Sequence, residues 1–206
     1  MNKHAFRQRL LTGAMGIVFS LSTAFAFAAP LAFEGGDLSR ARLAPEWTLQ
    51  DVSGATKTLE DYAGKVLMVY FGYTQCPDIC PTALAQAAHA MEVLDTGHED
   101  VQVIMVTVDP ERDTPDILDA YVKAFNPEFI GLYGDADALE KTADAFNVIY
   151  NKEATGDPEH YEMNHTAAFY LLDQKGQARV LIGPEMTGEE IVHDIKLLLK
   201  EGKQSS

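Results

Sequence analysis

The chain has 206 residues, with 31 acidic side chains against 16 basic ones and a formal net charge of −15. This length allows a single domain with a sizeable core. So acidic a chain is a poor ligand for nucleic acid or for an anionic lipid surface, because both carry negative charge. Composition therefore excludes those two classes of partner and leaves a soluble, well-solvated surface as its simplest explanation.

The first 29 residues have the parts of an export signal. Three basic residues, Lys3, Arg7 and Arg9, precede an uncharged stretch at 10–29 that ends in alternating alanines. A basic start, an apolar middle and small residues in an A-x-A pattern are typical of a secretory signal peptide. The stretch is also just long enough to cross a bilayer as an uncleaved anchor, but we favour cleavage. In either case we expect a periplasmic protein, soluble or tethered to the inner membrane.

Residues 30–45 follow, with two glycines, two arginines and no clear periodicity. We interpret them as a leader segment between the export signal and the folded domain, because neither a helical nor a strand period is present. The domain itself is predicted at 46–202.

From residue 46 the chain alternates between strands and helices. In chain order, apolar runs and helical periodicity predict strands at 47–50 and 66–71, a helix at 82–94, a strand at 101–108, a helix at 115–125, a strand at 129–133, a helix at 135–146, strands at 148–150, 167–172 and 178–182, and a helix at 187–199. The turn at 173–176 joins the last two strands into a hairpin. This order predicts an α/β fold with a mixed central sheet flanked by helices, and it resembles a thioredoxin-like fold.

The strongest strand leads directly to the only two cysteines, Cys76 and Cys80. Gly72 halts that strand, and the segment at 73–80, the cysteine loop, enters a helix at Pro81. Proline suits the first turn of a helix, where its missing N–H would be unpaired anyway. The thiols therefore lie at the amino end of a helix, where the helix dipole is expected to lower a cysteine pKa.

The spacing of the cysteines leaves three interpretations. If Cys80 is already helical, residues four apart face the same way, about 6 Å apart along the axis. Such a pair suits a disulfide, a redox couple or two ligands of one metal ion. A permanent disulfide around three intervening residues would stabilise the fold only weakly, because it removes little unfolded-state entropy. The Cys-x-x-x-Cys spacing also differs from the Cys-x-x-Cys of thioredoxins and zinc knuckles.

A metal held by both thiols needs a third ligand, and the candidate is His165. Four of the other histidines lie in predicted helices or acidic loops and are most simply surface residues: His89, His98, His160 and His193. In a thioredoxin-like arrangement the loop with His165 faces the cysteine loop, at the place where thioredoxins have a cis-proline. No proline occurs between Pro158 and Pro184. On the residues alone, His165 could also simply cap the end of a strand.

Three motifs resemble those of the Sco/SenC family of copper proteins. They are YFGYTQCPDICPT at 70–82, VDPERDTP at 108–115, and His165 followed by YLLD at 170–173. The resemblance runs in this order through nearly the whole domain. It implies a copper chaperone for the CuA centre of cytochrome c oxidase, with Cys76, Cys80 and His165 as copper ligands. The implied partner is subunit II of the oxidase or another copper chaperone.

The chemistry of these ligands agrees with copper in both oxidation states. Soft sulfur favours Cu(I), and an imidazole nitrogen lets Cu(II) bind as well. Zinc could take the same ligands plus a water, but copper lies above zinc in the general order of affinity. Near the ligands, Asp78 is expected to keep the loop solvated and Asp109 to support the site. Asn164 stands where the family usually has an acidic residue, so ligand orientation or Cu(II) affinity is expected to differ.

Two other functions would use the same thiols. A thiol-disulfide oxidoreductase would use Cys76 and Cys80 as a redox pair that reduces partner cysteines, with no need for His165. A peroxiredoxin-like peroxidase would need one activated thiolate beside an arginine, and Arg112 lies in a loop better explained as a turn that braces the site. We therefore predict a metallochaperone, with disulfide reduction as the alternative.

Overall fold

The computed structural model describes residues 31–204, except 42, 95–96 and 155–160. The predicted export segment at 1–29 lies outside the described residues. Within the described ranges, no helix combines the length and the hydrophobicity needed to span a membrane.

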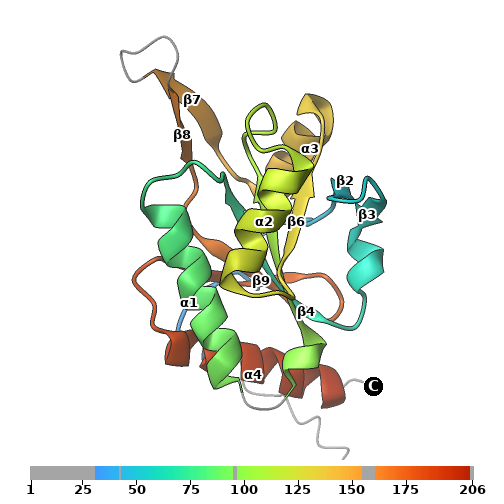
Figure 1. Ribbon diagram of the computed structural model, residues 1–206. Helices are drawn as coiled ribbons and strands as arrows, with labels where there is room; N and C mark the ends of the chain where they lie inside the picture. Colours follow the sequence, from blue (N-terminus) through green and yellow to red (C-terminus); the bar gives the residue numbers. More distant parts are fainter. Residues whose placement is uncertain (1–30, 42, 95–96, 155–160, 205–206) are drawn as a thin grey trace, which may run out of the picture. The chain divides into compact units, whose positions relative to one another are not determined.

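An eight-stranded mixed sheet forms the centre of the domain, in the order β1-β10-β9-β4-β5-β6-β2-β3 (Figure 1). The strands are β1 (Gly36–Asp37), β2 (Thr48–Asp51), β3 (Thr56–Thr58), β4 (Val66–Gly72), β5 (Val101–Thr107), β6 (Ile130–Tyr133), β9 (Phe169–Leu172) and β10 (Ala178–Ile182). β4, β5 and β6 are parallel, whereas β9 runs antiparallel to β4. Every residue of β4 is buried, which explains its unbroken apolar sequence.

In the described part of the chain, four α-helices accompany the sheet: α1 (Ile79–Val93), α2 (Pro115–Phe125), α3 (Ala136–Phe146) and α4 (Gly188–Gln204). Short 3₁₀ helices lie at Leu59–Tyr62 and His98–Asp100. α1 packs against α2 and α4, and α3 packs against β2. Thr114 caps α2, since its side chain accepts a hydrogen bond from the N–H of Ile117. The predicted mixed sheet, its helices and the terminal hairpin of β9 and β10 are confirmed.

One difference from the prediction concerns the start of α1, which begins at Ile79 instead of residue 82. The cysteine loop is polar and short, so its last residues show no helical period although they are already helical. Cys80 is thus the second residue of the helix.

A second difference is a separate two-stranded sheet of β7 (Tyr150–Ala154) and β8 (Tyr161–His165). The sequence predicted only a strand at 148–150 and a loop before residue 167. The last four residues of β7 are all exposed, and β8 has one buried residue, Met163. β7 has no buried face, so its sequence carries no alternating apolar pattern that would reveal it.

A third difference is that the segment predicted as a leader contributes an edge strand. In β1, Gly36 and Asp37 pair with Leu181 and Val180 of β10. Just before it, the N–H groups of Glu34 and Gly35 donate to the two carboxylate oxygens of Asp194, each at 2.9 Å. Asp194 is fully buried. The folded region therefore begins before the predicted boundary at residue 46.

This anchor predicts the effect of Asp194→Ala. Loss of the carboxylate removes both of these charge-assisted hydrogen bonds, so the free energy of unfolding should fall by about 1–3 kcal/mol. Urea unfolding measures this change, with Lys196→Ala, an exposed position on the same helix, as the control. An unchanged urea midpoint for Asp194→Ala would show that the segment before β1 contributes nothing to stability.

Candidate metal centre

Cys76, Cys80 and His165 converge beyond the carboxyl end of β4. Their ligand atoms, the two Sγ atoms and one imidazole nitrogen, all lie within 4.8 Å of one another. Cys80 Sγ is 3.4 Å from His165 Nε2, and the N–H of Cys80 donates to Cys76 Sγ over 3.4 Å. Both cysteines are buried and carry free thiols in this structure. The three side chains therefore have the donor types and proximity to hold one metal ion.

The close packing at this point requires a glycine at the end of β4. A Cβ atom on Gly72 would lie 2.6 Å from Cε1 of Tyr70 and 3.1 Å from Sγ of Cys80, both below ordinary contact distances. The backbone of β4 and the first turn of α1 can approach only because Gly72 has no side chain. Cys76 in turn satisfies one of the unpaired N–H groups at the start of α1.

The pKa of Cys80 differs from the expectation. Burial raises the pKa of this thiol to about 12, although the backbone of Tyr73 acts in the opposite direction. The prediction of a lowered pKa at the helix N-terminus is therefore wrong for Cys80. Complete removal of the sulfur from water disfavours the thiolate more than the helix dipole favours it. Without a metal, Cys80 is a protonated thiol near neutral pH.

His165 is held by the chain on one side and by two aromatic rings. Its Nδ1 lies 3.2 Å from the carbonyl oxygen of Thr166. When Nδ1 donates to this carbonyl, the lone pair of Nε2 is directed toward Cys80. The rings of Tyr70 and Tyr73 each lie 5.9 Å from the imidazole and nearly perpendicular to it. Burial lowers the pKa of His165, so the imidazole is neutral at physiological pH and able to bind a metal.

The three residues predicted to surround the ligands lie in different settings. Asp78 is exposed at the start of α1. Asn164 is exposed and, because neighbours in a strand alternate, lies on the opposite face of β8 from His165. Asp109 is buried and accepts hydrogen bonds from Arg112 Nε and, at 2.7 Å, from the hydroxyl of Tyr161.

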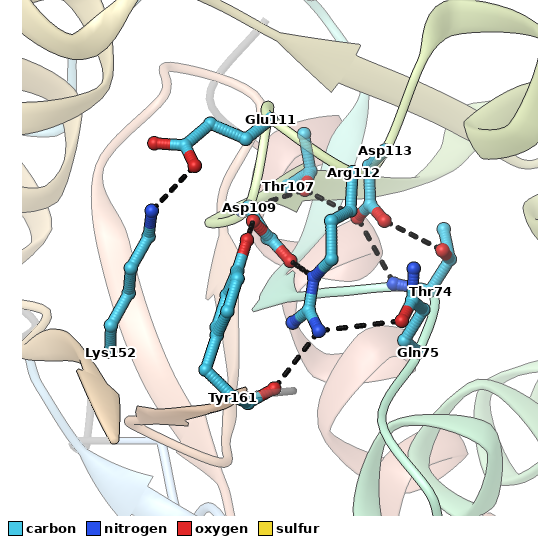
Figure 2. A network of polar contacts seen from close by, with 9 residues as sticks. All are labelled: Thr74, Gln75, Thr107, Asp109, Glu111, Arg112, Asp113, Lys152 and Tyr161. Carbon is cyan, nitrogen blue, oxygen red and sulfur yellow. Dashed lines mark hydrogen bonds and ion pairs between the residues drawn. The ribbon is translucent and has the colours of Figure 1, made fainter. Parts of the chain in front are cut away.

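The sequence missed how the loop between β5 and α2, residues 108–114, joins the two sides of the site (Figure 2). Arg112 Nη1 donates to the carbonyl of Tyr161 at 2.9 Å and to Oε1 of Gln75 at 3.3 Å. Gln75 precedes Cys76, and Tyr161 begins the strand that ends at His165. No periodicity links residues so distant along the chain, so only the fold reveals these contacts.

The same loop also binds the cysteine loop through Asp113. Its carboxylate accepts from the N–H and the hydroxyl of Thr74 at 3.0 and 2.6 Å, and from the hydroxyl of Thr107 at 2.6 Å. Burial raises the pKa of Asp113, against these hydrogen bonds. The cysteine loop is therefore fixed to the end of β5 by a buried carboxylate.

Comparison with known proteins agrees with this architecture. The SCO1/SenC family model matches residues 36–200. The SCO2-like protein RP587 of Rickettsia prowazekii is 32% identical over 186 residues, which cover 89% of each chain. Bradyrhizobium japonicum ScoI, solved with copper bound, superimposes with a TM-score of 0.70 at 34% identity, covering 76% of this chain and 99% of that chain.

A second solved structure is that of BsSco, a member of the Sco family of cytochrome c oxidase assembly proteins in which a disulfide switch was identified. It has a TM-score of 0.58 at 28% identity and covers 75% of this chain and 91% of that chain. The family match contains every strand of the central sheet, the cysteine loop and His165. The chain belongs to the SCO1/SenC family.

Proposed function

We propose that this protein is a copper metallochaperone that carries one copper ion on Cys76, Cys80 and His165 and delivers it to the CuA site of cytochrome c oxidase. The observation that carries the proposal is the convergence of two thiols and one imidazole within 4.8 Å. Its support from relatives is the copper-bound structure of Bradyrhizobium ScoI and the oxidase-assembly role attributed to the family of BsSco.

The ligand set suits a cargo ion better than a permanent one. Two sulfurs satisfy the soft Cu(I) ion, and the imidazole extends the site to Cu(II). Structural zinc sites, by contrast, are usually closed by four protein ligands. A site with three protein ligands leaves room for a ligand from the receiving protein, so copper transfer proceeds by stepwise ligand exchange. The fitting partner is subunit II of the oxidase, or another copper chaperone upstream.

We further infer a periplasmic location, with the chain either free or tethered to the inner membrane. The support is the basic, apolar and small-residue pattern at 1–29. The acidic domain suits such a place, because an acidic surface is well solvated and does not adhere to anionic lipid.

Disulfide reduction remains the alternative function. Cys76 and Cys80 are both free, and their contact through the N–H of Cys80 places the two sulfurs on the same side of the helix start. A disulfide switch has been identified in the relative BsSco. Reduction would use only the two thiols, so His165 distinguishes the two functions.

Replacement of single ligands tests the copper site. Cys76→Ser or Cys80→Ser should weaken both Cu(I) and Cu(II) binding by more than about 100-fold, and His165→Ala should weaken Cu(II) binding by as much. Loss of a metal ligand lowers the affinity more than loss of a group that only orients a ligand. Competition with a chelator measures the affinities. His98→Ala, an exposed histidine, is the control. Full copper affinity in His165→Ala, together with rapid reduction of a model disulfide, would favour the oxidoreductase.

Replacement of Asn164 tests the departure from the family pattern. Because Asn164 is exposed on the far face of β8, Asn164→Asp should change Cu(II) affinity by less than about fivefold, the range of an exposed ionic interaction. Titration with Cu(II) and the thiolate-to-Cu(II) absorption measure the effect. A larger gain would mean that an acidic side chain at this position reaches the ion.

The pKa values predict how copper loading depends on pH. Since burial raises the pKa of Cys80 to about 12, binding must release its proton throughout the neutral range. Burial lowers the pKa of His165, so the imidazole does not take up a competing proton there. Because binding releases the Cys80 proton, the apparent Cu(I) affinity should rise about tenfold per pH unit between about pH 6 and 8. Competition titrations at several pH values measure the slope, and a flat profile would contradict it.

A further inference from the structure

His165 lies at the end of β8, a strand that belongs to the separate two-stranded sheet. In the described part of the chain, β7 and β8 pair only with each other, and their hairpin extends away from the eight-stranded sheet (Figure 1). His165 is the last residue of β8, and its strand partner is Tyr150. The cysteines follow β4 at the centre of the sheet, and the chain after His165 returns to that sheet only at Phe169, where β9 pairs with β4. Sheet pairing therefore fixes the chain after His165, whereas the direction of β8 before it depends on contacts outside the central sheet.

At the other end of β8, Tyr161 is bound to the loop 108–114. Its hydroxyl donates to the fully buried carboxylate of Asp109 at 2.7 Å, and its carbonyl accepts from Arg112 at 2.9 Å. The Arg112 guanidinium also lies over the Tyr161 ring, with its Cζ 3.7 Å from the ring centroid. Tyr161 and His165 are four residues apart, about 13 Å along a strand. Fixing Tyr161 thus fixes the direction in which β8 presents His165.

Arg112 connects this hairpin to the cysteines. The same Nη1 that reaches Tyr161 also donates to Gln75, next to Cys76, and Nε donates to Asp109 (Figure 2). The Arg112 side chain is only 19% exposed, so water and salt screen these contacts little. The ion pair of Lys152 and Glu111 also joins the β7–β8 hairpin to the loop 108–114. These side chains are 46% and 68% exposed, so the pair holds the hairpin only weakly.

We propose that Arg112 and Tyr161 are positioning residues of the copper site, which clamp the β7–β8 hairpin to the cysteine loop and so set how closely His165 approaches the two sulfurs. This inference rests on the proposed function. The clamp should affect the affinity for Cu(II) more than the affinity for Cu(I), because two thiolates satisfy Cu(I) whereas tight Cu(II) binding needs the imidazole. Release of the clamp turns a three-ligand site into a two-sulfur site.

Two substitutions test the clamp. Tyr161→Phe removes only the hydroxyl, and Arg112→Lys keeps the charge but loses the planar fork that reaches several acceptors. Each should weaken Cu(II) binding by about 10–100-fold and alter the thiolate-to-Cu(II) absorption, while Cu(I) affinity changes by less than about threefold. The control is Arg179→Lys, because Arg179 is 15% exposed and joins Asp173 and Glu201, near the start of β4, away from the site.

The outcomes separate the clamp from the chaperone function and from general loss of structure. Wild-type Cu(II) affinity and absorption in both clamp variants would overturn the clamp and leave the chaperone function standing. Failure of the wild-type protein to bind copper would overturn both. An equal loss of Cu(I) and Cu(II) binding, matched by Arg179→Lys, would assign the effect to stability and also reject the clamp. If Arg112→Lys does not fold, Tyr161→Phe alone decides, with its thermal midpoint as the check on folding.

Discussion

The site depends on two parallel strands that end together. Gly72, the last residue of β4, is the register partner of Thr107, the last of β5, and the N–H of Val108 donates to the carbonyl of Gly72 at 2.9 Å. The cysteine loop and the loop 108–114 therefore leave the sheet side by side. Open α/β sheets commonly bind ligands beyond the carboxyl ends of their strands, for this reason. The cysteine loop carries the two thiols. The loop 108–114 carries Arg112 and Asp113, whose side chains bind the cysteine loop and hold it in place.

Burial decides how the two sulfurs behave. The helix start would favour a thiolate, but the interior position of Cys80 opposes it more strongly, as its raised pKa shows. A thiol that is protonated until a metal arrives resists stray oxidation, because the thiolate is the reactive form. Cys76 is 9% exposed and Cys80 is fully buried, so an incoming partner reaches Cys76 first. The same asymmetry would serve a chaperone or a reductase.

The sequence predicted the parts of the fold that have buried faces. β4 and the helices α2 and α3 were predicted within about one residue of their bounds, because burial leaves an apolar run or a helical period. β7 and β1 were not, since neither contains a buried residue and pairing alone defines them. For the site, two lone cysteines were sufficient to find the loop, whereas His165 needed the fold and the family motifs. The contact between Asp109 and Tyr161 joins residues 52 positions apart, which local pattern cannot reveal.

The perpendicular rings of Tyr70 and Tyr73 restrict His165 in a way that bears on kinetics. An imidazole packed between two rings has few rotamers, so its conformational entropy is lost when the protein folds and not when the ion arrives. Capture is then fast, because the ligand already points inward. Departure of the ion cannot begin with a simple side-chain rotation. In the function proposed above, release of the ion would then involve movement of the backbone at the end of β8 and not a rotation of the imidazole alone.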